Sequence, residues 1–236
     1  MAKQGKDIIE EAINEQHPHG GDWLREIVFG LNDGLVTTLV FIMVVSGIAS
    51  THIVVVVLGE VFAGAVSMAL GGYLSARTAQ EVLDKRIDTE KYEITNEPDE
   101  ERAELRAIYR EKGFSGPLLH RVVEHLTAND ERWLRAMIHD ELGVIKEEHI
   151  NPWLQGLQIG ISFLIGGLIP AIPVLLALPQ TRWWSYGLTA LTALVLGAVK
   201  ARYTRKGPMR AGFEFLAVVT VCTLAGVGIG LILHAG

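Results

Sequence analysis

Five apolar runs, each long enough to cross a lipid bilayer, set the strongest limit on how this chain can fold. The hydrocarbon core of a bilayer takes about 20 predominantly apolar residues per helix. The runs are Ile27–Ile48, Ile53–Leu74, Trp153–Leu178, Trp183–Tyr203 and Phe213–Leu233. The remaining sequence is too short in polar residues to cover five such helices in a soluble protein. We therefore expect an all-α membrane protein with five transmembrane helices.

Charge divides the chain into membrane segments and one polar insertion. Charged residues make up 20% of the sequence, and residues 79–150 hold most of the acids. The charge distribution predicts four parts. They are an N-terminal tail (1–24), helices one and two (25–78), a polar helical insertion (79–150) and helices three to five (151–236).

The insertion has the sequence pattern of a small three-helix module. No strong helix breaker occurs up to Glu93, so the second helix is expected to extend beyond the bilayer. Pro98 suits the first turn of a new helix that runs to about Lys112. A third helical stretch covers residues 116–141, with an interruption near 127–130 as an open alternative.

Lysine and arginine are concentrated at one side of the predicted topology, and in membrane proteins this is the cytoplasmic side. They precede helix one (Lys3, Lys6 and Arg25) and fill the loop between helices four and five (Lys200, Arg202, Arg205, Lys206 and Arg210). The N-terminus, the insertion and that loop are therefore expected to be cytoplasmic. Trp153, Trp183 and Trp184 fit the aromatic belt at the membrane interface.

Several other classes of protein are disfavoured. The first 26 residues lack the apolar core of a signal peptide. Cys222 is the single cysteine, so an intrachain disulfide is excluded. The basic loop between helices four and five is explained by topology, so a nucleic-acid partner is not expected. No organic cofactor is expected either.

Two carboxylates lie inside the predicted membrane helices, Asp33 in the first and Glu60 in the second. A charged carboxylate at the centre of a membrane helix costs roughly 2.5 kcal/mol or more, so such residues usually face a polar pathway or a partner ion. Met68 lies about 80° from Glu60 on one broad helix face. Oxygen with thioether sulfur suits a borderline divalent transition metal better than Mg²⁺ or Ca²⁺. The alternatives are interfacial placement of the acids, helix capping by Asp33 and simple packing of Met68.

The second and third membrane helices also carry unusual packing residues. A stripe of small residues at every fourth position of the second helix allows another helix to approach closely. The stripe consists of Gly59, Ala63, Ser67, Gly71 and Ser75. In the third helix, Pro170 and Pro173 remove backbone hydrogen bonds. They indicate either a simple kink near the membrane exit or a broken helix that lines an ion site.

The acids of the insertion are patterned in pairs one helical turn apart. The pairs are Glu90 with Glu93 and Glu101 with Glu104, and Glu141 follows Met137 by one turn. Carboxylates gathered in this way repel one another unless cations neutralise them. The neutralising cation is either a bound metal or a neighbouring basic residue such as Arg102. The histidines of the insertion, His120, His125, His139 and His149, are expected to be surface residues, because no His-x-x-x-His or Glu-x-x-His pair occurs there.

The residues in combination resemble the vacuolar iron transporter family. Arg25-Glu-Ile-Val-Phe-Gly-Leu-Asn-Asp-Gly-Leu-Val-Thr37 is similar to its first-helix signature, and Gly64-Ala-Val-Ser-Met-Ala-Leu-Gly71 to its second. Gly167-Leu-Ile-Pro-Ala-Ile-Pro173 is similar to its third helix. The glutamate spacing of the insertion, followed by Asp140-Glu-Leu-Gly143, is similar to its metal-binding domain. The resemblance extends from about Asp22 to the C-terminus.

The resemblance implies a five-helix protomer that forms a homodimer with a metal pathway at the two-fold axis. It implies export of Fe²⁺ from the cytosol in exchange for protons, with Mn²⁺, Co²⁺ and Zn²⁺ as further candidate substrates. By position, Asp33, Glu60 and Met68 match the transport pathway. The cytoplasmic metal-binding residues would be Glu90, Glu93, Glu101, Glu104, Met137 and Glu141. Ile138 stands where the family can have methionine and Gly72 where many members have glutamate, and both departures bear on metal preference.

The leading hypothesis is therefore a proton-coupled Fe²⁺ exporter, an antiporter rather than an enzyme. One alternative is a membrane-anchored di-iron ferroxidase, but such sites use Glu-x-x-His pairs and this insertion has Glu-x-x-Glu. Another alternative is a channel gated by a metal-sensing insertion. The sequence is compatible with a bacterial inner membrane and with a eukaryotic vacuolar membrane.

Overall fold

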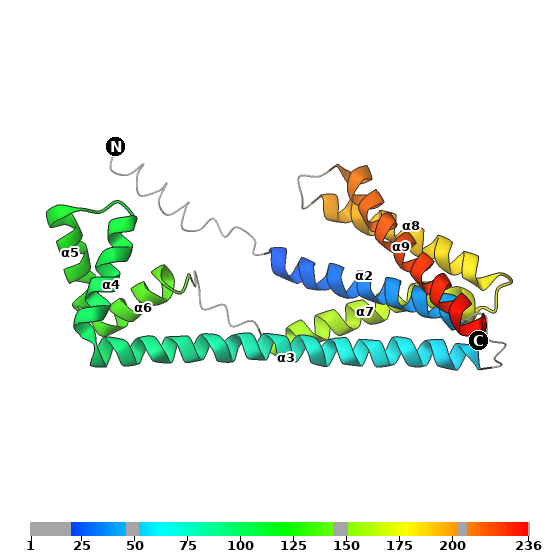
Figure 1. Ribbon diagram of the computed structural model, residues 1–236, viewed down its shortest axis with the longest axis horizontal. Helices are drawn as coiled ribbons and strands as arrows, with labels where there is room; N and C mark the ends of the chain where they lie inside the picture. Colours follow the sequence, from blue (N-terminus) through cyan, green and yellow to red (C-terminus); the bar gives the residue numbers. More distant parts are fainter. Residues whose placement is uncertain (1–19, 46–51, 144–150, 203–206, 236) are drawn as a thin grey trace, which may run out of the picture. The chain divides into compact units, whose positions relative to one another are not determined.

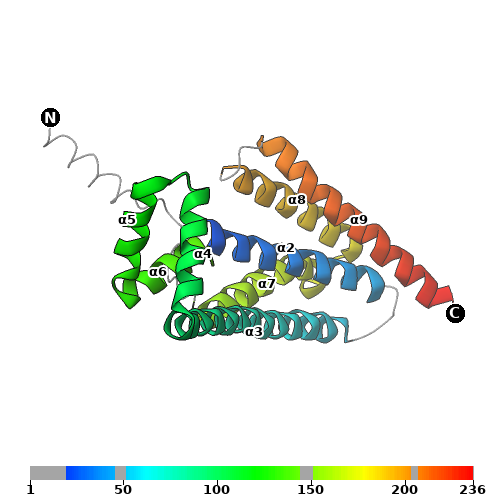
Figure 2. The same ribbon diagram turned by 60° about the vertical axis from the view of Figure 1, so that its left-hand side comes forward.

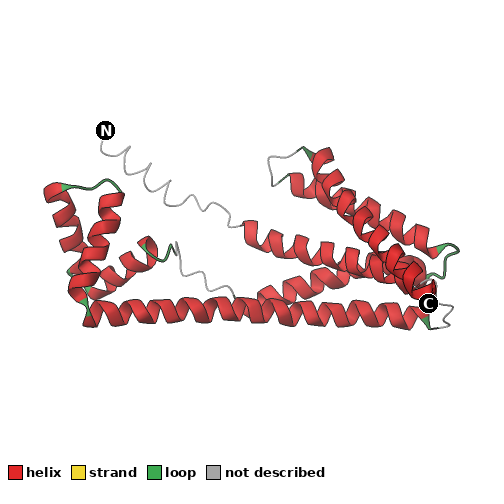
Figure 3. Ribbon diagram, viewed as in Figure 1, coloured by secondary structure: helices red, strands yellow, loops and turns green. Residues whose placement is uncertain are grey.

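The computed structural model describes residues 20–45, 52–143, 151–202 and 207–235. Within these ranges the protein is all-helical, with eight helices and no strand (Figure 3). The helices are α2 (Gly20–Val45), α3 (Ile53–Asn96), α4 (Pro98–Glu111), α5 (Gly116–Thr127), α6 (Asp130–Asp140), α7 (Pro152–Leu175), α8 (Thr181–Ala201) and α9 (Pro208–Ala235). The tail before residue 20 and His149 lie outside the described residues.

Five of these helices are long and apolar enough to cross a membrane, as the sequence predicts: α2, α3, α7, α8 and α9. Their ends differ from the predicted ends by a few residues, and α3 continues well beyond its apolar run. The chain divides into two compact units, and the division falls within α3. We call residues 1–74 with 152–236 the membrane unit and residues 75–151 the insertion unit.

In the membrane unit, α2 packs against α7, α8 and α9, and α8 lies beside α9 (Figures 1 and 2). Glycines allow the close approach of α2 to α7. A Cβ atom added at Gly34 would collide with the carbonyl oxygen of Phe163, and one added at Gly166 with the carbonyl oxygen of Leu31. The two backbones are therefore in direct contact, which is the packing that small residues permit between membrane helices.

The apolar part of α3 packs on the other side of α7 through a similar contact. A Cβ atom added at Gly160 would lie 2.6 Å from the Cβ atom of Ala69. The ring of Phe163 occupies the space above Gly64. The membrane unit is thus centred on α7, which has small residues on the faces toward both α2 and α3.

The two prolines of α7 do not break the helix. Helical geometry continues through Pro170 and Pro173 to Leu175. The carbonyl oxygen of Pro170 also accepts a hydrogen bond of 2.8 Å from the buried hydroxyl of Ser185 on α8. The alternative of an unwound segment at this point is therefore wrong, and the prolines lie within a helix that α8 supports.

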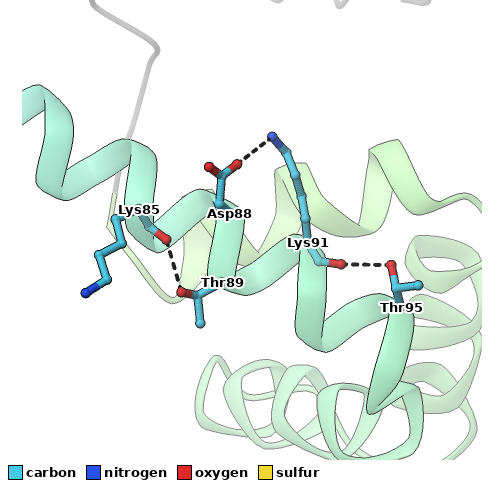
Figure 4. Close-up of polar contacts among 5 residues, drawn as sticks. All are labelled: Lys85, Asp88, Thr89, Lys91 and Thr95. Carbon is cyan, nitrogen blue, oxygen red and sulfur yellow. Dashed lines mark hydrogen bonds and ion pairs between the residues drawn. The ribbon is translucent and has the colours of Figure 1, made fainter.

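The second half of α3 is polar, in contrast to its first half. The helix has 44 residues, so it is about 66 Å long, roughly twice the thickness of the hydrocarbon core. Its polar half forms contacts within the helix: Lys91 is ion-paired with Asp88 at 3.2 Å, and the hydroxyl of Thr95 donates to the carbonyl oxygen of Lys91 (Figure 4). These exposed side chains are those of a solvated helix rather than of a membrane span.

The insertion unit consists of the end of α3 with α4, α5 and α6 around one apolar core (Figure 1). The core residues are Ile94, Leu105, Leu119, Val123, Trp133, Ala136 and Met137. Residues 116–141 form two helices, so the interruption that the sequence left open is present. It falls at Asn129, whose side chain accepts a hydrogen bond from the backbone N–H of Arg132 and caps α6.

Candidate functional site

Asp33 and Glu60 lie near each other in the membrane unit, each beside a threonine of α2. The hydroxyl of Thr38, whose side chain is fully buried, donates a hydrogen bond of 2.9 Å to Oε2 of Glu60. The hydroxyl of Thr37 donates a long hydrogen bond of 3.5 Å to Oδ1 of Asp33. The two carboxylates are half-buried and close enough to interact electrostatically. Two predicted pathway residues are therefore brought together from different helices.

Met68 lies at a different level of the membrane unit from Glu60. Helices α2 and α3 run in opposite directions, because core residues at their adjoining ends pack in one cluster. Met68 is eight residues after Glu60, about 12 Å further along α3. Asp33 is displaced by about 7.5 Å in the same direction, since it precedes Thr38 on α2 by five residues. Asp33 and Met68 thus lie at neighbouring levels, and Glu60 lies apart from Met68.

A third acid, Glu26, lies on the same face of α2 as Asp33. Its side chain is 11% exposed, is ion-paired with Arg25 at 2.9 Å and accepts a hydrogen bond of 3.1 Å from Gln155 on α7. Sequence reasoning did not single out Glu26. The seven-residue spacing from Asp33 was the available signal, because it places both acids on one helix face. Together, Glu26, Asp33 and Glu60 form a series of acids along the membrane unit.

In the insertion unit, the five predicted glutamates gather into one cluster, which we call the glutamate cluster. Helix α3 contributes Glu90 and Glu93, α4 contributes Glu101 and Glu104, and Glu141 follows α6. Two members are buried: Glu90 is 4% exposed and Glu101 is 5% exposed. Each of these two has one carboxylate oxygen, Oε2, with no hydrogen-bond partner in the described part of the chain. Buried oxygens without a partner are costly, so they indicate an environment suited to a positive charge.

The electrostatics of the glutamate cluster oppose ionisation of its members. Burial, followed by the hydrogen bond to Glu141 and its charge, raises the pKa of Glu90 to about 8. Burial, followed by the charges of Glu104 and Glu93, raises the pKa of Glu101 to about 7. Burial and the charge of Glu141 also raise the pKa of Glu104. A nearby cation would therefore stabilise the ionised form of each carboxyl group.

Neighbouring basic residues do not supply that cation. Arg102, the candidate from the sequence, is ion-paired with Asp99 at 3.4 Å, and its guanidinium carbon lies 5.2 Å from the ring centroid of Trp133. Among residues 20–45, 52–143, 151–202 and 207–235, none of the five glutamates has an ion pair with a basic side chain. In the same ranges no three carboxylates, imidazoles or thiols are arranged closely enough to hold a metal ion as they stand. The glutamates are thus neighbours, but their oxygens do not converge on one point.

The predicted sulfur ligand of the insertion, Met137, is fully buried in the apolar core beside Leu105 and Trp133. Ile138 next to it is half-buried. The described histidines of the insertion, His120, His125 and His139, are exposed, as the sequence predicts. Gly72, the other departure from the family, packs on α7: an added Cβ would lie 2.7 Å from Cδ1 of Ile159.

Comparisons with known proteins cover both units. The sequence model of the VIT family matches residues 24–231. Vacuolar iron transporter 1 of Tulipa gesneriana is 30% identical over 224 residues, which cover 93% of this chain and 90% of the tulip protein. Vacuolar iron transporter 2 of Oryza sativa subsp. japonica is 30% identical over 225 residues, 94% of this chain and 92% of the rice protein. The vacuolar iron transporter of Plasmodium falciparum is 28% identical over 224 residues, 89% of this chain and 82% of that protein.

Proposed function

The chain belongs to the VIT family, and on that premise we propose that it exports Fe²⁺ from the cytosol in exchange for protons. The pair of acids formed by Asp33 and Glu60 inside a five-span unit is the observation that carries this proposal. Relatives named as vacuolar iron transporters in plants and in Plasmodium falciparum support iron as the substrate. Mn²⁺ is the next candidate substrate, followed by Co²⁺ and Zn²⁺.

In the proposed transport cycle, Asp33 and Glu60 alternate between metal-bound and protonated forms. A carboxylate in a membrane is costly when it is charged and unpaired, so departure of the metal favours uptake of a proton. Thr38 holds Glu60 in place through its buried hydroxyl. Met68, at a level next to Asp33, would supply the soft ligand that favours a transition metal over Mg²⁺ or Ca²⁺.

The glutamate cluster would gather metal from the cytosol before transport. Its carboxylate oxygens suit a divalent cation, and the unpaired Oε2 atoms of Glu90 and Glu101 support this role. Their oxygens would have to draw together around the ion, because they do not converge as they stand. Met137 could contact the metal only by leaving the apolar core, so we assign metal binding in the cluster to the glutamates first.

We also propose that two copies of the chain associate through the small-residue stripe of α3. Within one protomer this stripe is open: Gly59 and Gly71 have no heavy atom within 4 Å of an added Cβ, and Ala63 and Ser67 are exposed. The adjacent face of α3, with Gly64 and Gly72, is the one that packs on α7. A stripe of small residues that is free on a membrane helix suits close packing against the same stripe of a second copy. The basic-residue bias supports a cytoplasmic insertion in such a dimer.

Metal flux into proteoliposomes tests the proposed transport. We expect Asp33→Ala to lower Fe²⁺ flux driven by a proton gradient by at least about tenfold, because even outer-shell changes at metal sites cost about 10–100-fold. Asp84→Ala is the control: Asp84 is an exposed acid on the polar half of α3 and should be dispensable. Wild-type flux in Asp33→Ala would contradict the proposed pathway. Fe²⁺ flux that is independent of the proton gradient would contradict proton coupling but not metal transport.

A further inference from the structure

Asp140, the last residue of α6, lies among three partners from α4 and its own helix. Lys112 forms an ion pair with Oδ1 of Asp140, and Nδ1 of His139 lies 2.7 Å from the same oxygen. The hydroxyl of Tyr109 also donates a hydrogen bond to this carboxylate. The ammonium of Lys112 lies 4.8 Å from the ring centroid of Tyr109, so the two α4 residues are themselves in contact.

Asp140 therefore differs from the neighbouring glutamates in having its charge neutralised. Its side chain is only 5% exposed. Burial alone would raise its pKa, but the hydrogen bonds from Lys112, His139 and Tyr109 outweigh burial and lower the pKa of Asp140. Burial and the hydrogen bond to Asp140 raise the pKa of Tyr109 to about 12. Lys112 and His139 both contact Oδ1, and Tyr109 donates to the same carboxylate, so Asp140 already has a cation beside it and is a poor metal ligand despite its position next to Glu141.

The same contacts join the ends of two helices. Lys112 is the C-cap residue of α4, and Asp140 is followed at once by Glu141, the C-cap residue of α6. The backbone N–H of Glu141 still donates to the carbonyl oxygen of Met137, so Glu141 is tied to α6. Joining the end of α6 to the end of α4 therefore sets where Glu141 lies relative to the α4 glutamates.

The position of Glu141 matters because it reaches Glu90 on α3. The two side chains share a hydrogen bond, and Glu141 also acts electrostatically on Glu101 and Glu104. Glu141 is exposed and follows the end of a helix, so apart from this hydrogen bond its side chain has little around it to orient it. The contacts of its neighbour Asp140 restrain the end of α6, to which the backbone of Glu141 is tied.

We propose that Asp140 is a positioning residue: through its ion pair with Lys112 and its hydrogen bond from Tyr109, it holds Glu141 in the glutamate cluster without binding metal itself. The metal-binding part of this inference rests on the proposed function. The positioning part does not, because it concerns only the distance between Glu141 and Glu90.

A cross-linking experiment on the full-length protein tests the positioning part without metal. Cys222→Ser removes the single cysteine, and Glu90→Cys with Glu141→Cys then introduces one pair for a short bismaleimide. We expect Lys112→Met to lower the cross-linking yield several-fold and Lys112→Arg to restore it. Lys85→Met is the matched control. Lys85 is an exposed lysine on α3, whereas Lys112 follows α4, and Lys85 has no contact with Asp140. Equal yields in the double-cysteine protein with and without Lys112→Met, both eluting as folded protein, would overturn the proposal.

Titration with Co²⁺ tests the metal-binding part, because the visible spectrum of Co²⁺ reports its ligand geometry. We expect Lys112→Met to weaken Co²⁺ binding by about tenfold and to alter the spectrum. In a Glu141→Gln background, Lys112→Met should not weaken Co²⁺ binding further, because Lys112 is proposed to affect the metal only through the Glu141 carboxylate. A purely structural role would instead lower affinity equally in both backgrounds and would overturn the proposal. If cross-linking responds to Lys112→Met but Glu141→Gln leaves Co²⁺ binding unchanged, the positioning role stands and the metal-gathering function of the cluster fails.

Discussion

The carboxylates of Glu60, Glu90 and Asp140 lie in three different environments. Glu60 accepts a hydrogen bond from the buried hydroxyl of Thr38. Asp140 is neutralised by Lys112. Glu90 is buried against other carboxylates and has one oxygen without a partner in the described part of the chain. The partners of an acid, rather than its type, therefore distinguish a proposed pathway residue, a structural ion pair and a candidate metal ligand.

At the residue scale, the raised pKa of Glu90 predicts how the stability of the metal-free insertion depends on pH. The folded state holds its proton more tightly than the unfolded state, so this contribution is fully present below pH 4.5 and is lost as pH rises through about 8. We expect Glu90→Gln to reduce this loss, because glutamine stays neutral at every pH. Hydrogen exchange of the α4 and α6 amides at pH 5 and pH 8, corrected for intrinsic rates, measures the change in stability between the two pH values.

The control for this prediction is Glu131→Gln. Glu131 is exposed and ion-paired with Arg135 on α6, away from the buried acids of the cluster, so its loss should not alter the dependence on pH. If Glu90→Gln retains the wild-type difference in protection between pH 5 and pH 8, burial of Glu90 is not the source of the dependence.

At the scale of elements, α7 is the helix against which the predicted pathway is built. Its glycines bring the backbones of α2 and α3 close, and these two helices carry Asp33 and Glu60. The helix ends of the insertion follow local signals, since Pro98 begins α4 and Asn129 caps α6. Contacts between helices depend instead on which small residues pack against each other. Because α3 and α7 each have small residues on several faces, local signals do not determine which of these faces are in contact.

The contact of α2 with α7 predicts the effect of one added methyl group. Gly34→Ala places a Cβ against the carbonyl oxygen of Phe163, and backbone cannot move aside as a side chain can. We expect it to destabilise the protein by about 1–3 kcal/mol. Gly187→Ala on α8 meets no atom within 4 Å and should change stability by less than about 1 kcal/mol, in the stabilising direction. Thermal unfolding in detergent compares them, and equal midpoints would show that the α2–α7 contact is looser than described.

At the scale of the whole molecule, the proposed dimer predicts that a bulky residue on the open stripe of α3 separates the protomers. Gly71→Leu adds a side chain where one protomer has open space, so the protomer should remain folded while the dimer is lost. Gly187→Leu, at an equally open glycine of α8, should leave the dimer intact. Light scattering of the purified protein in detergent measures the mass, and a Gly71→Leu dimer as stable as wild type would place the interface elsewhere.

The sequence by itself determined the five membrane-length helices, the helical insertion and the start of α4 near Pro98, and it left the break that Asn129 caps as an open alternative. These depend on hydropathy over a window of residues and on capping at single positions, both of which are local. It also identified Asp33 and Glu60, because an acid in an apolar run is visible without any contact.

Only the tertiary structure decided which residues lie around those acids. Thr38 beside Glu60, Lys112 on Asp140 and Met137 in the apolar core each depend on helices that are distant in sequence or on the side of a helix that faces its neighbour. The hydrogen bond that Glu26 accepts depends on the tertiary structure in the same way, since its donor Gln155 comes from α7. Helical periodicity states which residues share a face, but packing between helices determines what that face meets.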